Sequence, residues 1–433
     1  MRSVALAVLM EVAERDAYAN IALRKALGQG DMEPRDRALV TELVNETLRN
    51  LQYIDGVVNH FSKLPVDKMK PLIRTVLRLS VCQLRILTKI PPHAAVHQGV
   101  EMAKAHGFSS LSGFVNGVLR AVARQPDKPV TDPARWAQRY SYPEGLASSL
   151  VRWLGEDGAE SFARHSHTPP AIPIYTNTTK TTPTALEKSL QAQGVECTPL
   201  EGGFFIVRNT GDITALRAFE EGAFFVMDPG AMWVVHALGL EPGHVFLDLC
   251  AAPGGKAFAA ACVMGDAGEI IATDIHPHRV ALMEKAAKRL GLKSIKTMAQ
   301  DALAPIGLPL ADAVLLDVPC SGLGTLRKRP EIKHKYKGAN TALLDTQRDL
   351  LSAAAKRVKP GGVLVYATCT VAREENMEMV QGFCRAHPGF AVEPLPFLPP
   401  ANLPHFMQEN CLQLLPGLHN DGFFIARIRQ IFP

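Results

Sequence analysis

Two cysteines each follow an apolar run that reads as a buried strand. Cys320 ends the stretch 317–320, Asp-Val-Pro-Cys, and Cys369 ends the stretch 366–369, Tyr-Ala-Thr-Cys. A third apolar run, further upstream, leads into residues 250–256, Cys-Ala-Ala-Pro-Gly-Gly-Lys. A strand followed by a glycine turn is typical of a site for a nucleotide-like cofactor. A thiol beside such a turn suggests covalent catalysis, and a pair suggests one thiol that attacks and one that assists.

This arrangement could methylate carbon 5 of a pyrimidine, an atom that is itself a poor nucleophile. Addition of a thiolate to carbon 6 makes carbon 5 able to attack a methyl group; a base then removes the carbon-5 proton and the thiolate is expelled. A free thiol, with a pKa of about 8.5, is mostly protonated at neutral pH, so the site must supply positive charge or a base. Lys256 and the run 327–329, Arg-Lys-Arg, are available for this purpose.

Most free cysteines are small buried hydrophobic residues, so packing is the competing interpretation. Cys262 and Cys384 fit it, because both lie within helical patterns. Cys250 is ambiguous because it opens the glycine turn. The position of Cys320 and Cys369 at strand ends favours function over packing for these two.

Acidic residues follow the next two strands, as a nucleoside cofactor requires. Asp274 is placed to accept hydrogen bonds from ribose hydroxyls, and Asp301 is placed to reach an adenine amino group. Each could instead be an ordinary helix cap or turn residue. The set as a whole favours a nucleoside cofactor, and the absence of a GxGxxG pattern weakens an NAD site.

The 433 residues are too many for one ordinary domain. Up to about residue 125, apolar positions recur three and four apart and predict helices, and the proline-rich stretch 125–133 predicts a linker. The region 131–228 is mixed, with strands expected at 172–176, 204–207 and 224–227. Beyond it, strands alternate with helices and predict a parallel sheet covered on both faces, with ligands at the carboxyl ends of the strands. These strands are expected at 245–249, 270–274, 295–299, 313–317, 362–367 and 423–428.

Charge and composition narrow the class of protein further. Residues 1–130 hold 18 Lys/Arg and 12 Asp/Glu, a net +6, whereas the rest has 29 and 30, a net −1. A basic front part is suggestive of a nucleic-acid contact. The eight cysteines lack zinc spacing and do not resemble a secreted disulfide framework. We therefore expect no metal site, no membrane span and a cytoplasmic location.

Six motifs resemble the RNA 5-methylcytosine methyltransferases, and within them the RsmB (Sun/Fmu) family. Two front stretches, 36–51 and 95–122, are similar to the NusB-type helical domain that distinguishes this family, so the resemblance covers nearly the whole chain. It implies an all-α NusB-like N-terminal domain at 1–130, a small α+β middle region at 131–228, and an α/β Rossmann-like class I methyltransferase domain at 229–433. The six motifs are LDLCAAPGGK (247–256), ATDI (272–275), LLDVPCSGLGTLRKRPEIK (315–333), VKPGG (358–362), YATCT (366–370) and DGFFIARI (421–428).

The resemblance also implies a reaction, a substrate and the residues that take part. Methyl transfer from S-adenosylmethionine to a cytosine of 16S ribosomal RNA is implied, and we expect the protein to be a monomer. Cys369 is implied as the nucleophile, and Cys320 as the thiol that assists breakdown of the adduct. The implied cofactor residues are Cys250, Ala251, Ala252, Pro253, Gly254, Gly255, Lys256, Asp274, Asp301 and Asp317, the last facing both cofactor and base.

Some stretches bear on the choice of RNA rather than on the chemistry. The run 327–337 carries six Lys/Arg close after Cys320 and could clamp phosphates. The stretches 175–177, Tyr-Thr-Asn, and 225–228, Phe-Val-Met-Asp, depart from the family pattern, as does Thr370 in place of the usual Ser. A single-stranded loop suits such a cleft because its bases leave the stack easily.

Other interpretations stay open at this point. The RNA could be a transfer RNA or another ribosomal site. A DNA cytosine methyltransferase would use Cys320, in its Pro-Cys pair, as the attacking thiol. A NusB-like RNA-binding factor with an inert transferase half is a different class, against which the intact cysteines and glycine turn argue. Methylation of an exocyclic amine would require Pro-Pro-aromatic after the acid, where this chain has 318–320, Val-Pro-Cys.

Overall fold

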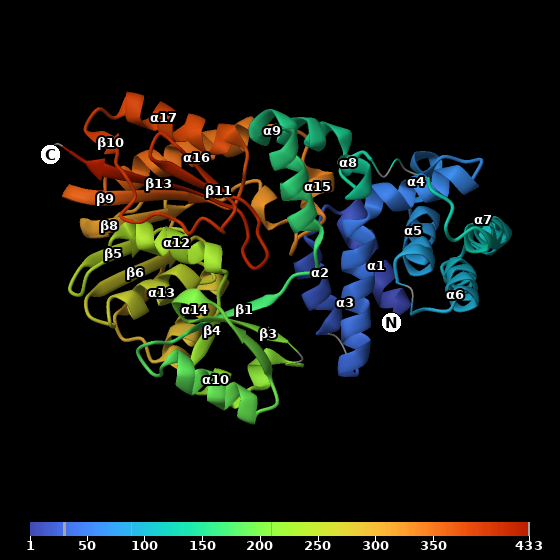
Figure 1. The fold of residues 1–433 in the computed structure, drawn as a ribbon, viewed down its shortest axis with the longest axis horizontal. Helices are drawn as coiled ribbons and strands as arrows, with labels where there is room; N and C mark the ends of the chain where they lie inside the picture. The colour runs from blue at the N-terminus through green and yellow to red at the C-terminus, as the bar shows by residue number, and fades with distance from the viewer. Residues whose placement is uncertain (29–31, 88, 131, 133, 209, 432–433) are drawn as a thin grey trace. The chain divides into compact units, whose positions relative to one another are not determined.

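The chain forms two compact units, each of which is made of two stretches of sequence. This computed structural model describes residues 1–28, 32–87, 89–130, 132, 134–208 and 210–431. One unit comprises Met1–Thr168 and Leu326–Gly338, and the other comprises Pro169–Thr325 and Ala339–Pro433 (Figure 1). The expected division at residues 130 and 228 stays a prediction, and residues 131 and 133 of the expected linker lie outside the described residues.

The first unit is helical, as its apolar spacing predicts. Helix α5 shows the pattern: Ile73, Val76 and Leu77 are buried and lie on one face. Proline occupies the first turn of α3, α5 and α6, where its missing N–H costs no hydrogen bond. The helices are α1 (Arg2–Glu14), α2 (Ala19–Leu27), α3 (Pro34–Arg49), α4 (Leu51–Phe61), α5 (Pro71–Arg85), α6 (Pro92–Ala105), α7 (Ser112–Arg124), α8 (Trp136–Arg139), α9 (Glu144–His167) and α15 (Ile332–Lys335).

The second unit contains a small antiparallel sheet before its main sheet. Its strand order is β2-β3-β1-β4, and it packs against α10 (Pro183–Ala192) and α11 (Arg217–Glu220). The strands are β1 (Ile172–Thr176), β2 (Glu196–Pro199), β3 (Phe204–Arg208) and β4 (Phe224–Val226). Three of them match the expected positions; β2 is mostly exposed and lacks the apolar run of a buried strand.

The main sheet has nine strands in the described part of the chain, ordered β11-β12-β13-β9-β8-β5-β6-β7, with β10 paired to β13. Helices α12 (Pro229–Leu238), α13 (Gly255–Val263) and α14 (Pro277–Leu290) share one core with it. Helices α16 (Thr341–Ala355) and α17 (Met377–Ala386) share another, so both faces are covered (Figure 1). The strands are β5 (Val245–Asp248), β6 (Glu269–Asp274), β7 (Ile295–Ala299), β8 (Ala311–Asp317), β9 (Val358–Thr368), β10 (Phe390–Val392), β11 (His405–Gln408), β12 (Cys411–Leu414) and β13 (Phe423–Gln430).

The prediction of an all-parallel sheet is wrong at one end. Strands β7, β6, β5, β8 and β9 are parallel neighbours. Strand β13 instead runs antiparallel to β9, with Ile425 opposite Ala367. It also pairs antiparallel with β12, which a short connection joins to it. A connection of that length reverses the chain, whereas a parallel crossover requires a dozen or more residues. The sheet is therefore mixed, and the predicted multidomain α and α/β organisation is confirmed.

Candidate active site

The carboxyl ends of the parallel strands bring three acidic residues to one edge of the sheet, two of which, Asp274 and Asp317, are predicted site residues. Asp248 ends β5, Asp274 ends β6 and Asp317 ends β8. In the register of β8 and β9, Asp317 lies opposite Ala367, two residues before Cys369. Open α/β sheets bind ligands at this edge.

The glycine turn brings bare backbone to this edge. Gly254 has φ +105° and immediately precedes α13. A Cβ at this position would lie 2.5 Å from Phe258 Cζ and 2.7 Å from Met283 Cγ, so a side chain has neither the backbone conformation nor the space that it needs. Ala251 N donates to Thr273 O over 2.7 Å, which ties the turn to β6. A ligand can therefore approach the main chain closely at the start of α13.

The two acids expected to bind the nucleoside also hold their own turns. Asp274 is 7% exposed, and its Oδ1 accepts from His276 N over 2.9 Å. Asp301 is exposed, and its Oδ1 accepts from Leu303 N over 2.9 Å. Gln300 N donates to Asp274 O over 3.1 Å, which brings the loop after β7 to the end of β6. Each carboxylate has a second oxygen, so a structural role does not prevent ligand contact.

Asp248 is a site residue that the sequence analysis missed. It is 1% exposed, and within the described structure neither carboxyl oxygen has a hydrogen-bond partner. Burial raises its pKa to about 7, against the opposing attraction of Lys256. An unsatisfied buried carboxyl beside a glycine turn is suited to a cationic or hydrogen-bond-donating ligand.

Lys256 and Asp317 form an ion pair across the sheet edge. Lys256 Nζ lies 2.5 Å from Asp317 Oδ2 and 5.5 Å from the centre of the Phe423 ring. Burial acts to lower the pKa of Lys256, but attraction to Asp317 and their hydrogen bond outweigh it, so the net shift is upward. The lysine therefore stays charged. Its charge also bears on the Cys369 sulfur.

The two thiols meet at this edge. Cys320 Sγ and Cys369 Sγ lie 3.2 Å apart, which is too long for a disulfide bond of about 2.05 Å, and both cysteines are free. Both are partly exposed, so neither is a packing residue sealed in the core. The hydrogen bond with Cys369, followed by burial, raises the pKa of Cys320 well above its ordinary value. Cys320 thus stays a thiol at neutral pH.

Comparisons with known proteins cover nearly the full length. Residues 235–429 match the family model for 16S rRNA methyltransferase RsmB/F, and residues 1–124 match that for the NusB family. A probable ribosomal RNA small subunit methyltransferase B of Synechocystis is 36% identical over 99% of both chains, and its Bacillus subtilis counterpart is 34% identical over 99% of this chain and 98% of its own. The chain belongs to the RsmB/F family.

Solved structures agree with this membership. The crystal structure of PH0851 superposes with a TM-score of 0.81 at 26% identity, over 99% of this chain and 98% of that one. A methyltransferase homologue from Pyrococcus horikoshii superposes with a TM-score of 0.58 at 28% identity, over 69% of this chain and 100% of its own. The predicted NusB-like helical part and methyltransferase fold are thereby confirmed, and the chain is a methyltransferase of the RsmB/F family.

A buried acid holds the Cys320 loop, and the sequence analysis missed it. Glu375 is 5% exposed, and its Oε2 accepts from Ser321 N and from Gln347 Nε2, each over 2.9 Å. Ser321 Oγ lies 2.7 Å from Thr370 Oγ1, so the departure from the family's usual serine keeps a hydroxyl that is in use. In sequence, Glu375 looks like a solvated residue of an acidic turn.

Glycine lets the two thiol loops touch. Gly324 N donates to Cys369 O over 2.8 Å, and Gly422 N donates to Gly324 O over 2.9 Å. A Cβ on Gly324 would lie 2.9 Å from Cys369 O and closer still to Gly422 O. The motif that begins at Asp421 thus lies beside the thiols because backbone meets backbone.

The basic run that the sequence analysis assigned to phosphates is largely used for packing in the helical unit. Arg327 is 4% exposed and donates to His165 O over 3.1 Å. Lys333 is 3% exposed, and its Nζ donates to Arg49 O over 2.5 Å and to Tyr140 O over 3.1 Å. The phosphate-clamp prediction is wrong for these two residues. Their hydrogen bonds hold backbone carbonyls, two of them at helix ends.

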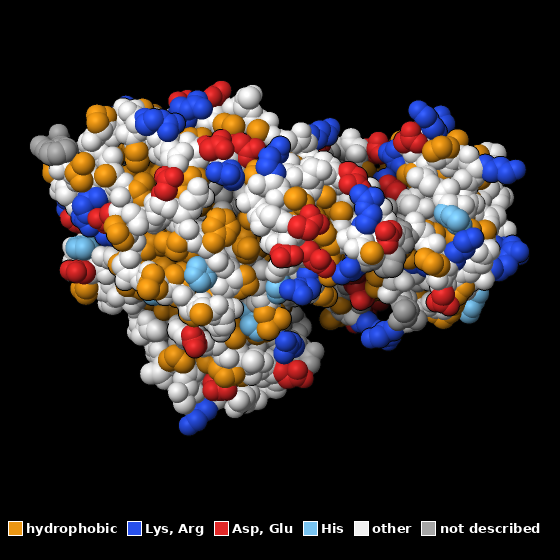
Figure 2. All heavy atoms as spheres, turned by 45° about the horizontal axis from the view of Figure 1, so that its top comes forward, with side chains coloured by type: hydrophobic (Ala, Val, Ile, Leu, Met, Phe, Trp, Pro, Cys, Tyr) orange, Lys and Arg blue, Asp and Glu red, His pale blue; other side chains and the backbone are white. Residues whose placement is uncertain are grey.

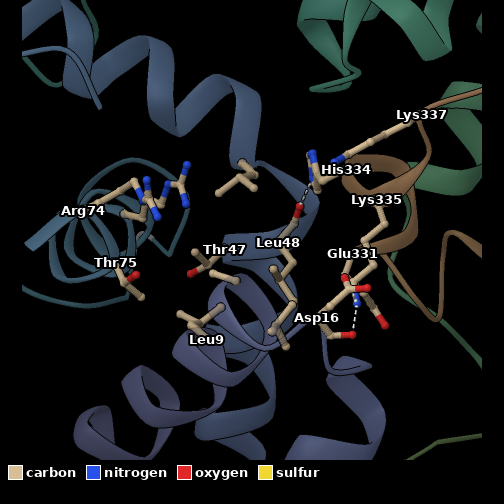
Figure 3. Close-up of a pocket in the computed structure, with 14 residues that line it drawn as sticks. Leu9, Asp16, Thr47, Leu48, Arg74, Thr75, Glu331, His334, Lys335 and Lys337 are labelled. Atoms are coloured by element: carbon tan, nitrogen blue, oxygen red, sulfur yellow. Dashed lines mark hydrogen bonds and ion pairs between the residues drawn. The ribbon is translucent and has the colours of Figure 1, made fainter. Parts of the chain in front are cut away.

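The neighbours of Lys333 line a cavity of about 580 Å³ in the same unit (Figure 3). His334 Nε2 lies 2.7 Å from Leu48 O, and Lys335 Nζ donates to Asp16 O over 2.6 Å. Glu331 Oε1 accepts from Ala19 N over 3.0 Å. The segment Leu326–Gly338 is therefore an integral part of the helical unit.

The middle-region departures are also structural. Tyr175 is 7% exposed, and Asn177 is fully buried. Asn177 Nδ2 donates to Gly222 O and Leu290 O, each over 2.9 Å, so it joins the small sheet to α14. Asp228 Oδ1 accepts from Gly230 N and from Asp421 N, over 2.9 and 3.0 Å.

The residues that the structure describes also bear on metal sites and membrane spans. Among them, no group of three or more His, Cys, Asp or Glu side chains is arranged to hold a metal ion. None of the described helices is long and apolar enough to cross a membrane.

Proposed function

We propose that this chain transfers a methyl group from S-adenosylmethionine to carbon 5 of a cytosine in 16S ribosomal RNA. The observation that supports this most is the contact of two free thiols, 3.2 Å apart, at the sheet edge that also carries the glycine turn. The curated relatives are named as small-subunit ribosomal RNA methyltransferases. Ribosomal RNA as substrate also implies that the protein acts in the cytoplasm.

The residues at the edge fit the cofactor. Gly254 leaves room for a ligand against the main chain, and Asp248 offers an unsatisfied carboxyl. Asp274 and Asp301 stand at the following strand ends for the ribose and the adenine. When bound there, S-adenosylmethionine supplies an electrophilic methyl group on a positively charged sulfur. The carboxyl of Asp248 would attract that charge.

Cys369 is the nucleophile in this proposal. Lys256 brings a positive charge to bear on the Cys369 sulfur, whereas the raised pKa keeps Cys320 protonated before the adduct forms. The Cys369 thiolate forms a bond to carbon 6 of the flipped cytosine, and the displaced electron pair makes carbon 5 nucleophilic. Asp317, fixed by Lys256, hydrogen-bonds the base on its polar edge.

Cys320 assists release. After carbon 5 has gained the methyl group, its proton must leave and the bond between Cys369 and carbon 6 must break. In the adduct the Cys369 sulfur is bonded to carbon 6 and no longer raises the pKa of Cys320, whose thiol can then lose its proton to water. The resulting Cys320 thiolate accepts the carbon-5 proton, and the electron pair of the broken C–H bond restores the ring double bond as the Cys369 thiolate departs. Glu375 and Gln347 keep the Cys320 loop in place through Ser321 and Pro319.

The test uses purified full-length protein, S-adenosylmethionine with a labelled methyl group, and 16S ribosomal RNA from cells that lack the gene. We expect label in 5-methylcytosine at one position, located by bisulfite sequencing, and none with Cys369→Ala. Transfer RNA and large-subunit ribosomal RNA serve as controls for the substrate. Label on an exocyclic amine, or no label although the cofactor binds, would contradict the proposal.

A further inference from the structure

A second cavity lies on the α/β unit and contains none of the residues assigned above to cofactor or catalysis. Its volume is about 630 Å³, within the range of small-ligand sites. Three parts of the unit line it: the turn after β2, one side of α12 and the loops around Leu403 and Asn420. In Figure 2, apolar side chains and histidines gather on the visible face of this unit.

The wall that α12 contributes is aromatic. Trp233 and His236 both line the cavity, with ring centres 5.8 Å apart. Phe397 supports them from outside, 5.0 Å from Trp233 and 6.2 Å from His236. Phe204, from β3, also lines the cavity. Neither Trp233 nor His236 is fully buried, so these rings offer a surface on which a flat ring can stack.

The charge of the lining selects the kind of ligand. Among the described residues that line this cavity, none is lysine or arginine, and Glu201 is acidic. Burial lowers the pKa of His236, so it adds no positive charge at neutral pH. A phosphate group has no counter-charge here, whereas the face of a neutral aromatic base needs none.

The cavity adjoins the thiol site through the backbone. Pro229 and Asn420 line it, and their neighbours Asp228 and Asp421 are joined by the 3.0 Å bond described above. The next residue, Gly422, donates a backbone hydrogen bond to Gly324 O, and Gly324 N donates in turn to Cys369 O. When one base of an RNA strand lies at Cys369, a neighbouring nucleotide of the same strand can therefore reach this cavity.

We propose that the cavity binds the base of a nucleotide next to the target cytosine, stacked against Trp233 and His236. This rests on the proposed function and adds to it a subsite for single-stranded RNA. A target base that leaves its stack exposes its neighbours, and stacking of one of them on Trp233 offsets part of that cost. Such stacking tolerates different bases because every base presents an aromatic face.

The test is direct binding of an RNA oligonucleotide to the full-length protein, followed by fluorescence anisotropy. One oligonucleotide carries the target and its flanks intact, and others carry an abasic nucleotide at each flanking position in turn. Stacking is worth about 1–3 kcal/mol per base, so Trp233→Ala should weaken binding roughly 5- to 150-fold. Trp233→Phe should retain most of the affinity. Phe406→Ala, an exposed aromatic on β11 outside the cavity, is the matched control and should bind as the parent does.

The result that establishes the subsite is a lack of additivity. If the base at one flanking position stacks on Trp233, removal of that base combined with Trp233→Ala should reduce the binding free energy no more than either change alone. Additive losses at every position, or no loss with Trp233→Ala, would overturn the inference. His236→Ala, at a partly exposed position, supplies the same test should Trp233→Ala unfold.

Binding separates this inference from the proposed function, because no turnover is needed. Normal methylation by the parent, together with unchanged RNA binding by Trp233→Ala, would refute the subsite and leave the proposed reaction standing. Non-additive binding without any methyl transfer would refute the proposed reaction and leave the subsite standing.

Discussion

Cys320 Sγ and Cys369 Sγ touch, 3.2 Å apart, because two neighbouring parallel strands end together. Asp317 pairs with Ala367 in the register of β8 and β9, and the thiols follow three and two residues later. The register thus aligns the ends of β8 and β9 so that one ligand can contact both sulfurs. The roles of the two thiols should consequently separate on mutation.

Cys320→Ala should accumulate a covalent complex of protein and RNA, and Cys369→Ala should form none. Without Cys320 the adduct on Cys369 forms but breaks down slowly, whereas without Cys369 no bond to carbon 6 can form. A denaturing gel with labelled RNA and S-adenosylmethionine distinguishes the two. Cys384→Ala, in α17 away from the strand ends, is the control and should behave as the parent. An adduct with Cys369→Ala would instead identify Cys320 as the attacker.

Glu375→Gln should slow turnover without preventing cofactor binding. One carboxylate oxygen accepts from both Ser321 N and Gln347 Nε2, and charge strengthens both bonds. We expect turnover to fall by about tenfold or more and stability by about 1–3 kcal/mol, since a neutral amide weakens a buried network. Glu378→Gln, at an exposed position of α17, should change neither. Single-turnover kinetics and thermal unfolding measure the two effects.

Asp248 should make cofactor binding depend on pH. Its pKa is raised to about 7, chiefly by burial, so the cofactor-free carboxyl is neutral in acid and charged in mild alkali. The affinity for the positively charged cofactor should therefore rise with pH up to and through about 7. The change is at most tenfold per pH unit, the limit for one titrating group.

Calorimetry on the parent and on Asp248→Asn from pH 6 to 8.5 checks this expectation. The substitution should weaken binding at high pH and flatten the profile, because its side chain cannot ionise. Lys256 and Asp317 also face this carboxyl, so an unchanged slope in Asp248→Asn would assign the titration to that pair instead.

Strand positions were predictable from the sequence where the strands are short, apolar and buried. Strands β5 and β6, which are mostly buried, are each within one residue of their expected bounds. Strand β7 matches its expected bounds although most of its residues are exposed. Strand β11 was not predicted, since its side chains are half-exposed and mixed in character. Strand β12 is buried but contains Gln413, whose amide bonds Thr370 O and Phe423 O. A buried glutamine in a four-residue strand carries no periodic signal.

Side-chain partners were less predictable than strands. The position of both cysteines after strands predicted a shared edge, but contact between the sulfurs depends on register. Glu375 was missed, and Lys333 was wrongly assigned to phosphates, for one physical reason: composition cannot distinguish a solvated charge from a buried one whose partners are distant in sequence. Glu375 is held by Gln347, 28 residues away, and Lys333 by Arg49, 284 residues away.

Lys333→Met should destabilise the helical unit. The ammonium donates to two backbone carbonyls and lies 4.8 Å from the centre of the Tyr142 ring. Burial lowers the pKa of Lys333 well below the ordinary value, which shows that burying the ammonium already costs the parent protein some stability. Loss of both bonds leaves buried acceptors unsatisfied, at about 1–3 kcal/mol each.

Thermal unfolding and limited proteolysis of the segment Leu326–Gly338 check this prediction. A lower unfolding midpoint and faster cleavage within the segment are expected. Lys337→Met, at the exposed end of the same segment, should leave both unchanged. Equal stability of Lys333→Met and the parent would show that an apolar side chain of similar length fills the site as well.

Acid should destabilise the helical unit through His334. Burial, followed by repulsion from Lys333, lowers the pKa of His334 to about 3, against an ordinary value of 6.5. The unfolded chain therefore binds a proton that the folded chain does not between these two values. The contribution to stability is fully present above pH 6.5 and is lost as pH falls toward 3, with a slope of up to about 1.4 kcal/mol per pH unit. His334→Gln keeps an N–H donor for Leu48 O but cannot ionise, so urea unfolding at pH 7, 6, 5 and 4.5 should show a shallower loss than in the parent. His93→Gln, at an exposed position of α6, is the control and should retain the parent slope. Equal slopes in all three proteins would assign the acid sensitivity to other groups. His167 would be the first of these, because burial lowers its pKa to about 3 as well.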